Sequence, residues 1–441
     1  MKKKQYIVAL EIGSSKVVGA IAEKTEQGIV MVQHLEEEKQ INCVRYGCVQ
    51  NVENIKSCIN HILRKLEQAV DGTINHVYVG LSGRSVHSES SEVNRSVDSS
   101  KPITREVIDG IIREVSRNAV KKYETVGVVP RTFYVDKKET EYAVGQFGSS
   151  IKIKVNLIVA NPTVKLNLER VMGMGPEVKN YYITALAMGQ HVLTADERKL
   201  GCMLVDMGAE TTTVSIYKNS SLVYLNTLPL GGRTLTKDVA NACSVLEETA
   251  ERIKKNIDNP LDITQVDSVL IEGVNSREAA NYINARMGEI LANVNKQLEY
   301  AEITASELTA GVVIAGGASQ LKGMLNKVAE ATKLKVRMAN FPQTLNITNS
   351  RILGKPEYVE VLSLLAEAAQ NIDPMDTCVE VHSYDNGDAF DVHGPAAQPT
   401  QPAEPVKHEP VKQKPEKKKS GWLKNLLDKA ANMVTEDDNE I

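Results

Sequence analysis

The hydrophobic pattern of the chain opens with two short apolar runs joined by a polar turn. Residues 6–10 are apolar, an acid and a glycine follow within three positions, and residues 17–22 are mostly apolar again. This pattern predicts a strand, a tight turn and a second strand. It returns at residues 201–217. The matched residues are Glu11 with Asp206 and Gly13 with Gly208, at an offset of 195 residues. We therefore expect a duplicated α/β chain whose two lobes carry equivalent hairpins.

Three further stretches have readable patterns. Residues 151–159 alternate apolar and polar positions, which is typical of a strand. Residues 310–323 predict an apolar strand that runs through a glycine pair into a helix. Residues 244–255 predict a helix, and the spacing from Ser244 to Glu247 is that of a capping box at its start.

Composition changes after an apolar helix predicted over residues 359–369. Residues 372–419 hold seven of the fifteen prolines and no sustained hydrophobic period. Such a segment cannot bury enough surface to fold. Its spaced prolines favour an extended backbone, and its end is rich in lysine. We interpret residues 373–419 as a disordered, semi-rigid tether.

An amphipathic helix is predicted after the tether, over residues 420–434. Ser420 is a suitable N-cap. The apolar stripe includes Trp422, Leu423, Leu426 and Leu427, and the opposite face carries Lys424 and Lys429. A basic cluster beside a Trp/Leu face is typical of a helix that lies in a membrane surface. The alternative is a tail helix that docks on its own core or on a partner protein.

Composition excludes several classes of protein. The chain has 441 residues, 42% of them hydrophobic, which is ordinary globular composition for about two to four domains. The net charge of -4 provides no positive field for nucleic acid. Six cysteines without a CxxC pair indicate reduced, mostly buried thiols. Neither an export signal nor a membrane-spanning run is visible, so we expect a cytoplasmic protein.

Each predicted hairpin has the chemistry of a phosphate-binding loop. Glycine lets the backbone turn closely, so that successive N–H groups and hydroxyls converge on a phosphate. The loop residues are Gly13, Ser14, Ser15 and Lys16 in the first hairpin and Gly208, Ala209, Glu210 and Thr211 in the second. Glu11 and Asp206 would hold Mg²⁺ through water, because this ion keeps several of its waters. An ordinary hairpin turn is the alternative for either loop taken alone.

Two other elements have features of a nucleotide site. Gly316 and Gly317, followed by Ala318, leave room for an adenosine or a phosphate near a helix N-terminus. A buried strand with a tight turn is the alternative. Glu251 and Lys254 share one face of their predicted helix. Taken alone, that pair is an ordinary surface salt bridge.

The four elements together, in this order, resemble the superfamily of actin, sugar kinases and heat-shock chaperone ATPases. Within it the chain is similar to the FtsA family of bacterial cell-division proteins. The likeness covers about residues 5–372 and 420–434, and it includes residues 187–201, which lead into the second loop.

The resemblance implies an actin-like fold with two lobes around a cleft that binds ATP and Mg²⁺. It also implies an FtsA-type inserted subdomain that supports polymerisation. The expected parts are a first lobe of residues 1–81 with 161–199 and 350–372, an inserted subdomain of residues 82–160, a second lobe of residues 200–232 with 301–349, a small partner-binding subdomain of residues 233–300, the linker 373–419 and the membrane-targeting helix 420–434.

The resemblance further implies partners and a location. Members attach the FtsZ ring to the inner face of the cytoplasmic membrane at the division septum, associate into filaments and help to recruit later division proteins. The small subdomain grips the acidic C-terminal tail of FtsZ. We expect Arg286 to contact a partner carboxylate, because a guanidinium gives bidentate geometry. A merely solvated arginine is the alternative.

One departure bears on activity. The first loop has Glu11 where the superfamily generally has Asp, and Ile183 stands near the position where hydrolytic relatives orient water. Gln190 is the only close amide. Without an obvious group to position water, we expect tight nucleotide binding and slow turnover.

Other functions of the same fold remain open from the sequence. A metabolite kinase needs an acidic base and a sugar pocket, and neither can be identified. A chaperone needs a substrate domain, for which little sequence remains beyond residue 372. A pilus or microcompartment assembly ATPase would be distinguished by whether the tail binds lipid.

Overall fold

The first predicted hairpin lies at the centre of a six-stranded sheet. The structure of the chain is a computed structural model that describes residues 4–117, 122–173, 175–350 and 352–382. The sheet order is β12-β7-β1-β2-β3-β20. Its strands are β1 (Gln5–Ile12), β2 (Lys16–Lys24), β3 (Val30–Lys39), β7 (His76–Leu81), β12 (Glu177–Ile183) and β20 (Leu345–Asn346). β1 and β2 pair antiparallel, as the pattern predicts, and β7 and β12 are parallel to β1.

The second lobe repeats this arrangement. Its strands are β13 (Cys202–Met207), β14 (Thr212–Lys218), β15 (Ser221–Leu228), β18 (Gly311–Ala315) and β19 (Val336–Met338). The order β15-β14-β13-β18-β19 matches β3-β2-β1-β7-β12 of the first lobe. The pairing directions also match, antiparallel along the hairpins and parallel beyond them. The predicted duplication is therefore confirmed.

Helices cover the sheets and build the cores. The helices around the first sheet are α1 (Val52–Val70), α3 (Pro162–Met172), α4 (Thr184–His191) and α10 (Val359–Asn371), while α5 (Ala195–Leu200) and α9 (Met324–Thr332) lie against the second. α10 is the helix predicted over 359–369. It packs against β1 and α4, and Val359, Leu362 and Leu365 are fully buried. This position explains why the helix is apolar on nearly all sides.

The segment between β15 and β18 consists mainly of helices. They are α6 (Gly232–Ala242), α7 (Glu247–Asn256) and α8 (Ser276–Tyr300), with a short hairpin of β16 (Leu270–Ile271) and β17 (Val274–Asn275). The predicted helix over 244–255 forms, but its capping box is wrong. Ser244 has a left-handed φ of 54° in the turn before the helix, and the N-cap is Leu246. A residue with left-handed φ cannot serve as the N-cap, which has an extended backbone, so α7 begins later, at Glu247.

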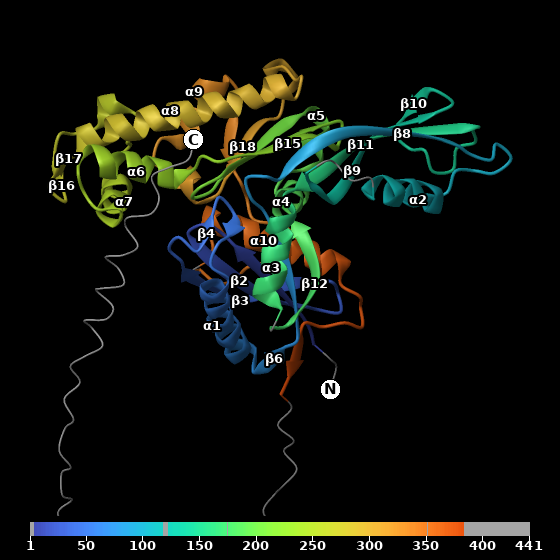
Figure 1. Cartoon of the computed structure of the whole chain (residues 1–441), viewed down its shortest axis with the longest axis horizontal. Coiled ribbons are helices and arrows are strands. Elements are labelled where there is room, and N and C mark those ends of the chain that lie inside the picture. The colour runs from blue at the N-terminus through green and yellow to red at the C-terminus, as the bar shows by residue number, and fades with distance from the viewer. Residues whose placement is uncertain (1–3, 118–121, 174, 351, 383–441) are drawn as a thin grey trace, which may run out of the picture. The chain divides into compact units, whose positions relative to one another are not determined.

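The inserted subdomain has a core of its own. It contains β8 (His87–Ser96), α2 (Arg105–Ser116), β9 (Glu124–Val135), β10 (Lys138–Thr140) and β11 (Ser150–Ala160). β11 confirms the strand predicted from alternation at 151–159, and its inward residues pack against α2. β8 also pairs with β15 of the second lobe, at His87 and Asn226. The sheet of the inserted subdomain therefore continues that of the second lobe, as the ribbon of β8 shows (Figure 1).

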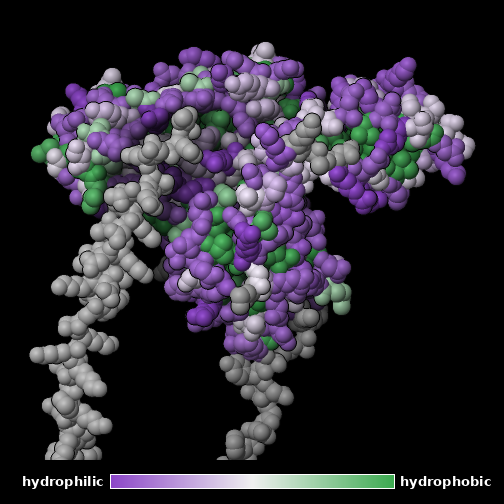
Figure 2. Space-filling model, viewed as in Figure 1, coloured by the Kyte–Doolittle hydropathy of each residue, from purple (hydrophilic) through white to green (hydrophobic). Residues whose placement is uncertain are grey.

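Hydrophobic patches remain on the surface of the inserted subdomain (Figure 2). The large side chains that stay exposed there include Tyr142, Val144 and Phe147. Exposed apolar clusters of this kind are often interaction surfaces.

The end of the described chain corrects one predicted boundary. β21 (Val379–Val381) pairs antiparallel with β6 (Gly72–Ile74), and Cys378 N–H donates to the Tyr6 carbonyl. Residues 373–382 therefore belong to the folded part and not to the tether, because β21 forms a two-stranded sheet with β6 and Gln5 binds the Asp373 and Asp376 carbonyls. The remaining predicted tether and the amphipathic helix of 420–434 lie outside the described residues.

The thiols are free, as the cysteine pattern predicts. All six cysteines are in the described residues and carry free thiols, of which Cys43, Cys202 and Cys378 are buried. Within the described ranges, no helix has the length and apolar character needed to cross a membrane.

Candidate functional site

The two hairpin turns have the same backbone geometry. Gly13 N–H donates to the Lys16 carbonyl at 3.0 Å, and Gly208 N–H donates to the Thr211 carbonyl at 2.8 Å. A Cβ on Gly13 would lie 3.1 Å from a Glu11 carboxylate oxygen and from the Lys16 carbonyl. Glycine therefore lets each turn fold tightly beside its acid.

Three carboxyl groups lie together where the two hairpins meet. The pKa of Glu11 is raised to about 7, mainly by burial; Lys16 opposes the rise and the nearby Asp206 adds to it. Burial also raises the pKa of Asp206 well above its usual range, with Glu360 contributing. Glu360 stands in the first turn of α10, and its pKa is raised to about 8 by burial and then by Glu11. Sequence reasoning missed Glu360, although a single acid at the start of an apolar helix was the available signal.

These carboxyl groups fit a divalent cation held through water. Asp206 Oδ1 is buried and has no hydrogen-bond partner among the described residues. A cation would satisfy that oxygen and offset both the burial and the mutual repulsion that raise the three pKa values. Across the described ranges, no three His, Cys, Asp or Glu side chains form a complete metal site. Glu11 and Asp206 are thus suited to the waters of an ion whose other ligands are phosphate oxygens, and that ion would neutralise phosphate charge.

The side chains of the first loop are already engaged. Ser14 Oγ accepts a hydrogen bond from Gly47 N–H at 3.0 Å, while Ser15 is exposed. Lys16 Nζ pairs with Glu37 at 2.6 Å and lies 4.4 Å from the centre of the Tyr358 ring. Of the predicted loop residues, Ser15 is therefore the most accessible side chain.

The second loop is held from two sides. Gly232 N–H donates to the Gly208 carbonyl at 3.0 Å, and Arg233 N–H donates to the Ala209 carbonyl at 2.7 Å. The first turn of α6 thus fixes the loop. Glu210 is buried, with 3% of its surface exposed, although it was predicted as a residue that contacts ATP.

The glycine pair divides into two roles. Gly316 has a φ of +83°, and a Cβ there would lie 2.5 Å from the Met207 carbonyl and 2.6 Å from Asp206 Oδ1. A Cβ on Gly317 would meet no described atom within 4 Å, which agrees with the predicted room for a ligand. The predicted helix start is wrong here. Residues Gly317–Gln320 form a 3-10 turn, and α9 begins only after Gly323, whose positive φ interrupts the helix.

Glu251 and Lys254 form an ion pair in α7, in which the lysine is buried and the glutamate is partly exposed. Their carboxylate and ammonium lie 2.6 Å apart. Lys254 Nζ also donates to the Gly232 carbonyl at 3.0 Å and to Thr236 Oγ1 at 2.8 Å. Burial lowers the pKa of Lys254, while Glu251 opposes that change. The ordinary surface salt bridge considered from the sequence is therefore excluded.

These contacts bring the predicted elements together. The charges of Glu11 and Asp206 interact across the two hairpins, and the absence of a Cβ at Gly316 leaves space for Asp206 Oδ1. Gly232 links the second loop to Lys254, and a Cβ on it would lie 3.0 Å from Ala318 Cβ. Sequence reasoning missed Arg233, Thr236 and Glu360. It also missed Arg45 and Tyr46, whose Nε and backbone N–H lie 3.2 Å and 2.7 Å from the Glu210 carboxylate oxygens. The assembled site offers backbone turns, buried lysine and carboxylates around one region, which is chemistry suited to a phosphate ester with a cation.

Gln190 lies away from this region. It stands in the last turn of α4 with an exposed side chain, and its backbone carbonyl accepts a hydrogen bond from Arg198 Nη1. Thr184, at the other end of the helix, is the residue of α4 that lies beside Gly80 and β1. Six residues of helix separate the two positions by about 9 Å. A catalytic role for Gln190 stays a prediction.

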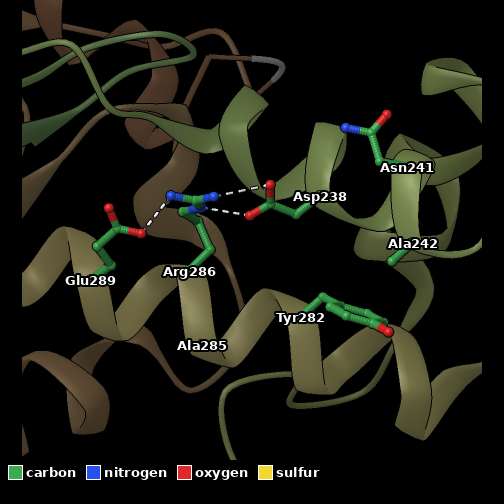
Figure 3. A pocket seen from close by; sticks show the side chains of 7 residues that line it. All are labelled: Asp238, Asn241, Ala242, Tyr282, Ala285, Arg286 and Glu289. Atoms are coloured by element: carbon green, nitrogen blue, oxygen red, sulfur yellow. Dashed lines mark hydrogen bonds and ion pairs between the residues drawn. The ribbon is translucent and has the colours of Figure 1, made fainter.

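Arg286 lies in a groove of 530 Å³ between α6 and α8 (Figure 3). Its Nη2 donates to Asp238 Oδ1 at 3.1 Å, and Nε binds the second oxygen of the same carboxylate. Nη1 pairs with Glu289. The guanidinium is thus not merely solvated, and its bidentate partner is a residue of this chain.

Comparisons with known proteins agree with this architecture. A family model described as cell division protein FtsA matches residues 203–363. The chain is 30% identical to cell division protein FtsA of Porphyromonas gingivalis, over 82% of this chain and 78% of that protein. It is 26% identical to cell division protein FtsA of Bacillus subtilis, over 84% of this chain and 85% of that protein.

A solved structure also shares the fold. The PilM-PilN type IV pilus biogenesis complex contains a chain that matches with a TM-score of 0.58 at 16% identity, over 82% of this chain and 98% of that one. At this identity the likeness concerns the fold alone, which is actin-like. The relatives at higher identity carry the assignment, and the chain belongs to the FtsA family of cell-division proteins.

Proposed function

We propose that this chain binds ATP with Mg²⁺ between its two lobes and attaches FtsZ filaments to the inner face of the cytoplasmic membrane at the division septum. The observation that carries the nucleotide part is the meeting of two equivalent hairpin turns at the carboxyl groups of Glu11 and Asp206. Gly317 and Lys254 border the same region. No residue has been assigned to position water, so we expect slow hydrolysis.

Calorimetry of the full chain tests the nucleotide site. Titration with ATP should show binding that requires Mg²⁺ and that weakens when a chelator is added, because the cation screens the carboxyl groups from the phosphates. Absence of ATP binding in the presence of Mg²⁺ would contradict the proposal.

The groove between α6 and α8 is the proposed site for the acidic tail of FtsZ. Arg286 supplies the positive charge, and Tyr282 supplies an exposed apolar surface beside it. Asp238 and Glu289 already neutralise the guanidinium, so a partner carboxylate must compete with them.

This competition gives a two-way test with an FtsZ tail peptide in fluorescence anisotropy. Arg286→Glu should weaken binding about tenfold or more, since a charge-assisted bidentate contact is lost. Asp238→Asn should strengthen it, because the internal competitor is removed. Equal affinity of both variants and the unchanged chain would exclude the groove.

Membrane attachment is assigned to the helix predicted at residues 420–434. A fusion of residues 420–441 should float with anionic vesicles, and Trp422→Glu should abolish flotation of the full chain. Burial of each large apolar side chain contributes about 1.5 to 3 kcal/mol, against about 1 kcal/mol for each lysine near the surface. Lys424→Gln is the matched control with a small expected effect. Failure of the fusion to float, even when dimerised, would favour protein docking.

Self-association and recruitment complete the proposal. The exposed Tyr142, Val144 and Phe147 make the inserted subdomain the proposed surface for filament contacts or for later division proteins. Replacement of Phe147 by Asp should lower the sedimentation of ATP-bound chain on lipid. Unchanged sedimentation would remove this surface from the proposal.

A further inference from the structure

The loop of residues 42–47, which joins the first sheet to α1, has an unusual backbone. Asn42 has a φ of 57°, Tyr46 of 50° and Gly47 of 75°. The left-handed region suits glycine and is tolerated by asparagine, but it is strained for a tyrosine. Gly47 is also required by space, because a Cβ there would lie 2.5 Å from Gly83 Cα. Strain of this kind persists only where the surroundings fix it.

Two adjacent amides of this loop contact both hairpin turns. Gly47 N–H donates to Ser14 Oγ of the first turn at 3.0 Å. Tyr46 N–H donates to Glu210 Oε2 of the second turn at 2.7 Å. The left-handed backbone thus points successive N–H groups at the two phosphate loops, and successive N–H groups of this kind form an anion-binding concavity.

Two arginines complete a positive environment around the same carboxylate. Arg45 Nε lies 3.2 Å from Glu210 Oε1, and Arg233 Nη1 donates to that oxygen at 3.2 Å. Arg233 Nη2 donates to Asn42 Oδ1 at 2.9 Å, and Arg233 also pairs with Glu247. The Nε atom of Arg45 is buried and has no hydrogen-bond partner among the described residues.

We propose that Arg45, Arg233 and the amide of Tyr46 form a binding site for the terminal phosphate of a nucleoside triphosphate, which the Glu210 carboxylate fills in this structure. A carboxylate and a phosphate accept from the same guanidinium and N–H donors. The Tyr46 N–H comes from the loop of residues 42–47, and Arg233 comes from α6. Glu210 is almost fully buried between these donors. This inference rests on the proposed binding of nucleotide between the lobes.

The arrangement makes Glu210 a specificity-determining residue. A terminal phosphate gains the two arginines only by displacing Glu210, so the carboxylate lowers affinity for a triphosphate. A diphosphate lacks the group that enters the site and is affected less. The contacts of the Tyr46 and Gly47 amides hold the loop of residues 42–47 against the two hairpin turns. When a phosphate displaces the Glu210 carboxylate, it takes over the contact with Tyr46, so the lobes stay connected.

Calorimetry of the full chain with Mg²⁺ and either ATP or ADP tests the inference. Glu210→Gln keeps the shape and an acceptor for Tyr46 but removes the charge. We expect about tenfold tighter ATP binding, because charged hydrogen bonds become available to phosphate, and less than about threefold change for ADP. Arg45→Gln should weaken ATP binding by a similar factor and leave ADP unchanged. The control is Glu272→Gln, which removes an exposed Glu–Arg pair elsewhere in the second half of the chain.

The outcomes separate the two proposals. If the unchanged chain binds neither nucleotide, the proposed nucleotide function fails and this inference fails with it. If ATP binds and Glu210→Gln has the affinity of the unchanged chain, only the inference is overturned. Hydrogen exchange without nucleotide adds an independent measurement. Glu210→Ala should speed exchange at the Tyr46 amide, which loses its acceptor, whereas the Gly47 amide keeps Ser14 Oγ; unchanged exchange at Tyr46 would also overturn the inference.

Discussion

The first and second hairpin turns share one backbone geometry but differ in their surroundings. In the first, Ser14 accepts one amide and Lys16 turns to Glu37 on the neighbouring strand. In the second, α6 fixes the turn, and Lys254 donates to the Gly232 carbonyl beneath it. The difference teaches that duplication preserved the turn, whereas side-chain roles diverged. Gln40 binds the Gly13 and Ser15 carbonyls of the first turn much as α6 binds the second turn, so the buried lysine is what distinguishes the second turn.

The largest effect is expected when the buried Lys254, which binds the Gly232 carbonyl next to the second turn, is replaced. Lys254→Met should destabilise the chain by about 2 to 3 kcal/mol, because the Gly232 carbonyl, Thr236 and Glu251 lose a charged donor. Denaturant unfolding measures the change. The matched control is Lys255→Met, which pairs with the same Glu251 but is exposed. Equal stability of the two variants would contradict the difference between the turns.

The second test compares the two acids. Asp206→Asn should lower the Mg²⁺-dependent affinity for ATP about 10- to 100-fold, as residues that orient the ligands of an ion do. Glu11→Gln should have a smaller effect, because its oxygen is not the one left without a partner. Calorimetry at fixed Mg²⁺ measures both, and Asp258→Asn, on an exposed pair with Lys322, serves as control. A larger loss of ATP affinity for Glu11→Gln than for Asp206→Asn would contradict the greater importance of Asp206.

The third test uses pH, through Glu360 at the meeting of the turns. The pKa values of Glu11 and Glu360 are raised from 4.5 to about 7 and about 8, so the folded chain holds these protons more tightly than the unfolded chain. Stability from this source is complete below pH 4.5 and is lost as pH rises through 7 to 8. Thermal unfolding with a chelator should therefore give a lower Tm at pH 8 than at pH 5.

The variant Glu360→Gln should flatten that pH dependence and raise Tm at pH 8, by about 2 to 4 °C for each kcal/mol of repulsion removed. The exposed Glu299→Gln is the control. A Tm profile that keeps its full pH dependence in Glu360→Gln would place the titration elsewhere.

The smallest effect is expected at Lys16. Its pair with Glu37 is partly exposed, so Lys16→Gln should cost about 0 to 1 kcal/mol in denaturant unfolding. ATP affinity should change less than in Asp206→Asn. A loss as large as that of Asp206→Asn would mean that Lys16 leaves Glu37 and reaches the nucleotide.

Sequence reasoning succeeded where a local pattern repeats. The two hairpins were predicted from the acids and glycines at an offset of 195 residues, and both form the expected turn. Strand β11 followed from alternation, and α10 from its apolar composition. Local failures occurred at helix starts, where Ser244 and Gly317 adopt turns that the spacing of polar residues does not reveal.

The loop of residues 42–47 carried no pattern that predicted a role. Its amides act through backbone conformation, and the arginines that meet there lie 188 positions apart, at Arg45 and Arg233. The same reason explains why Glu360 was missed. Residues distant in the chain become one site only when the lobes pack.

What the sequence by itself determined was the duplicated α/β fold, the position of each turn and its acid, and the family. These depend on periodicity and on residue types within short windows, which local steric and hydrophobic preferences control. The tertiary structure alone decided that Glu210 pairs with two arginines, that Lys254 is buried and that Asp238 forms an ion pair with Arg286. Burial and charge pairing depend on distances between side chains, and packing of separate segments sets those distances.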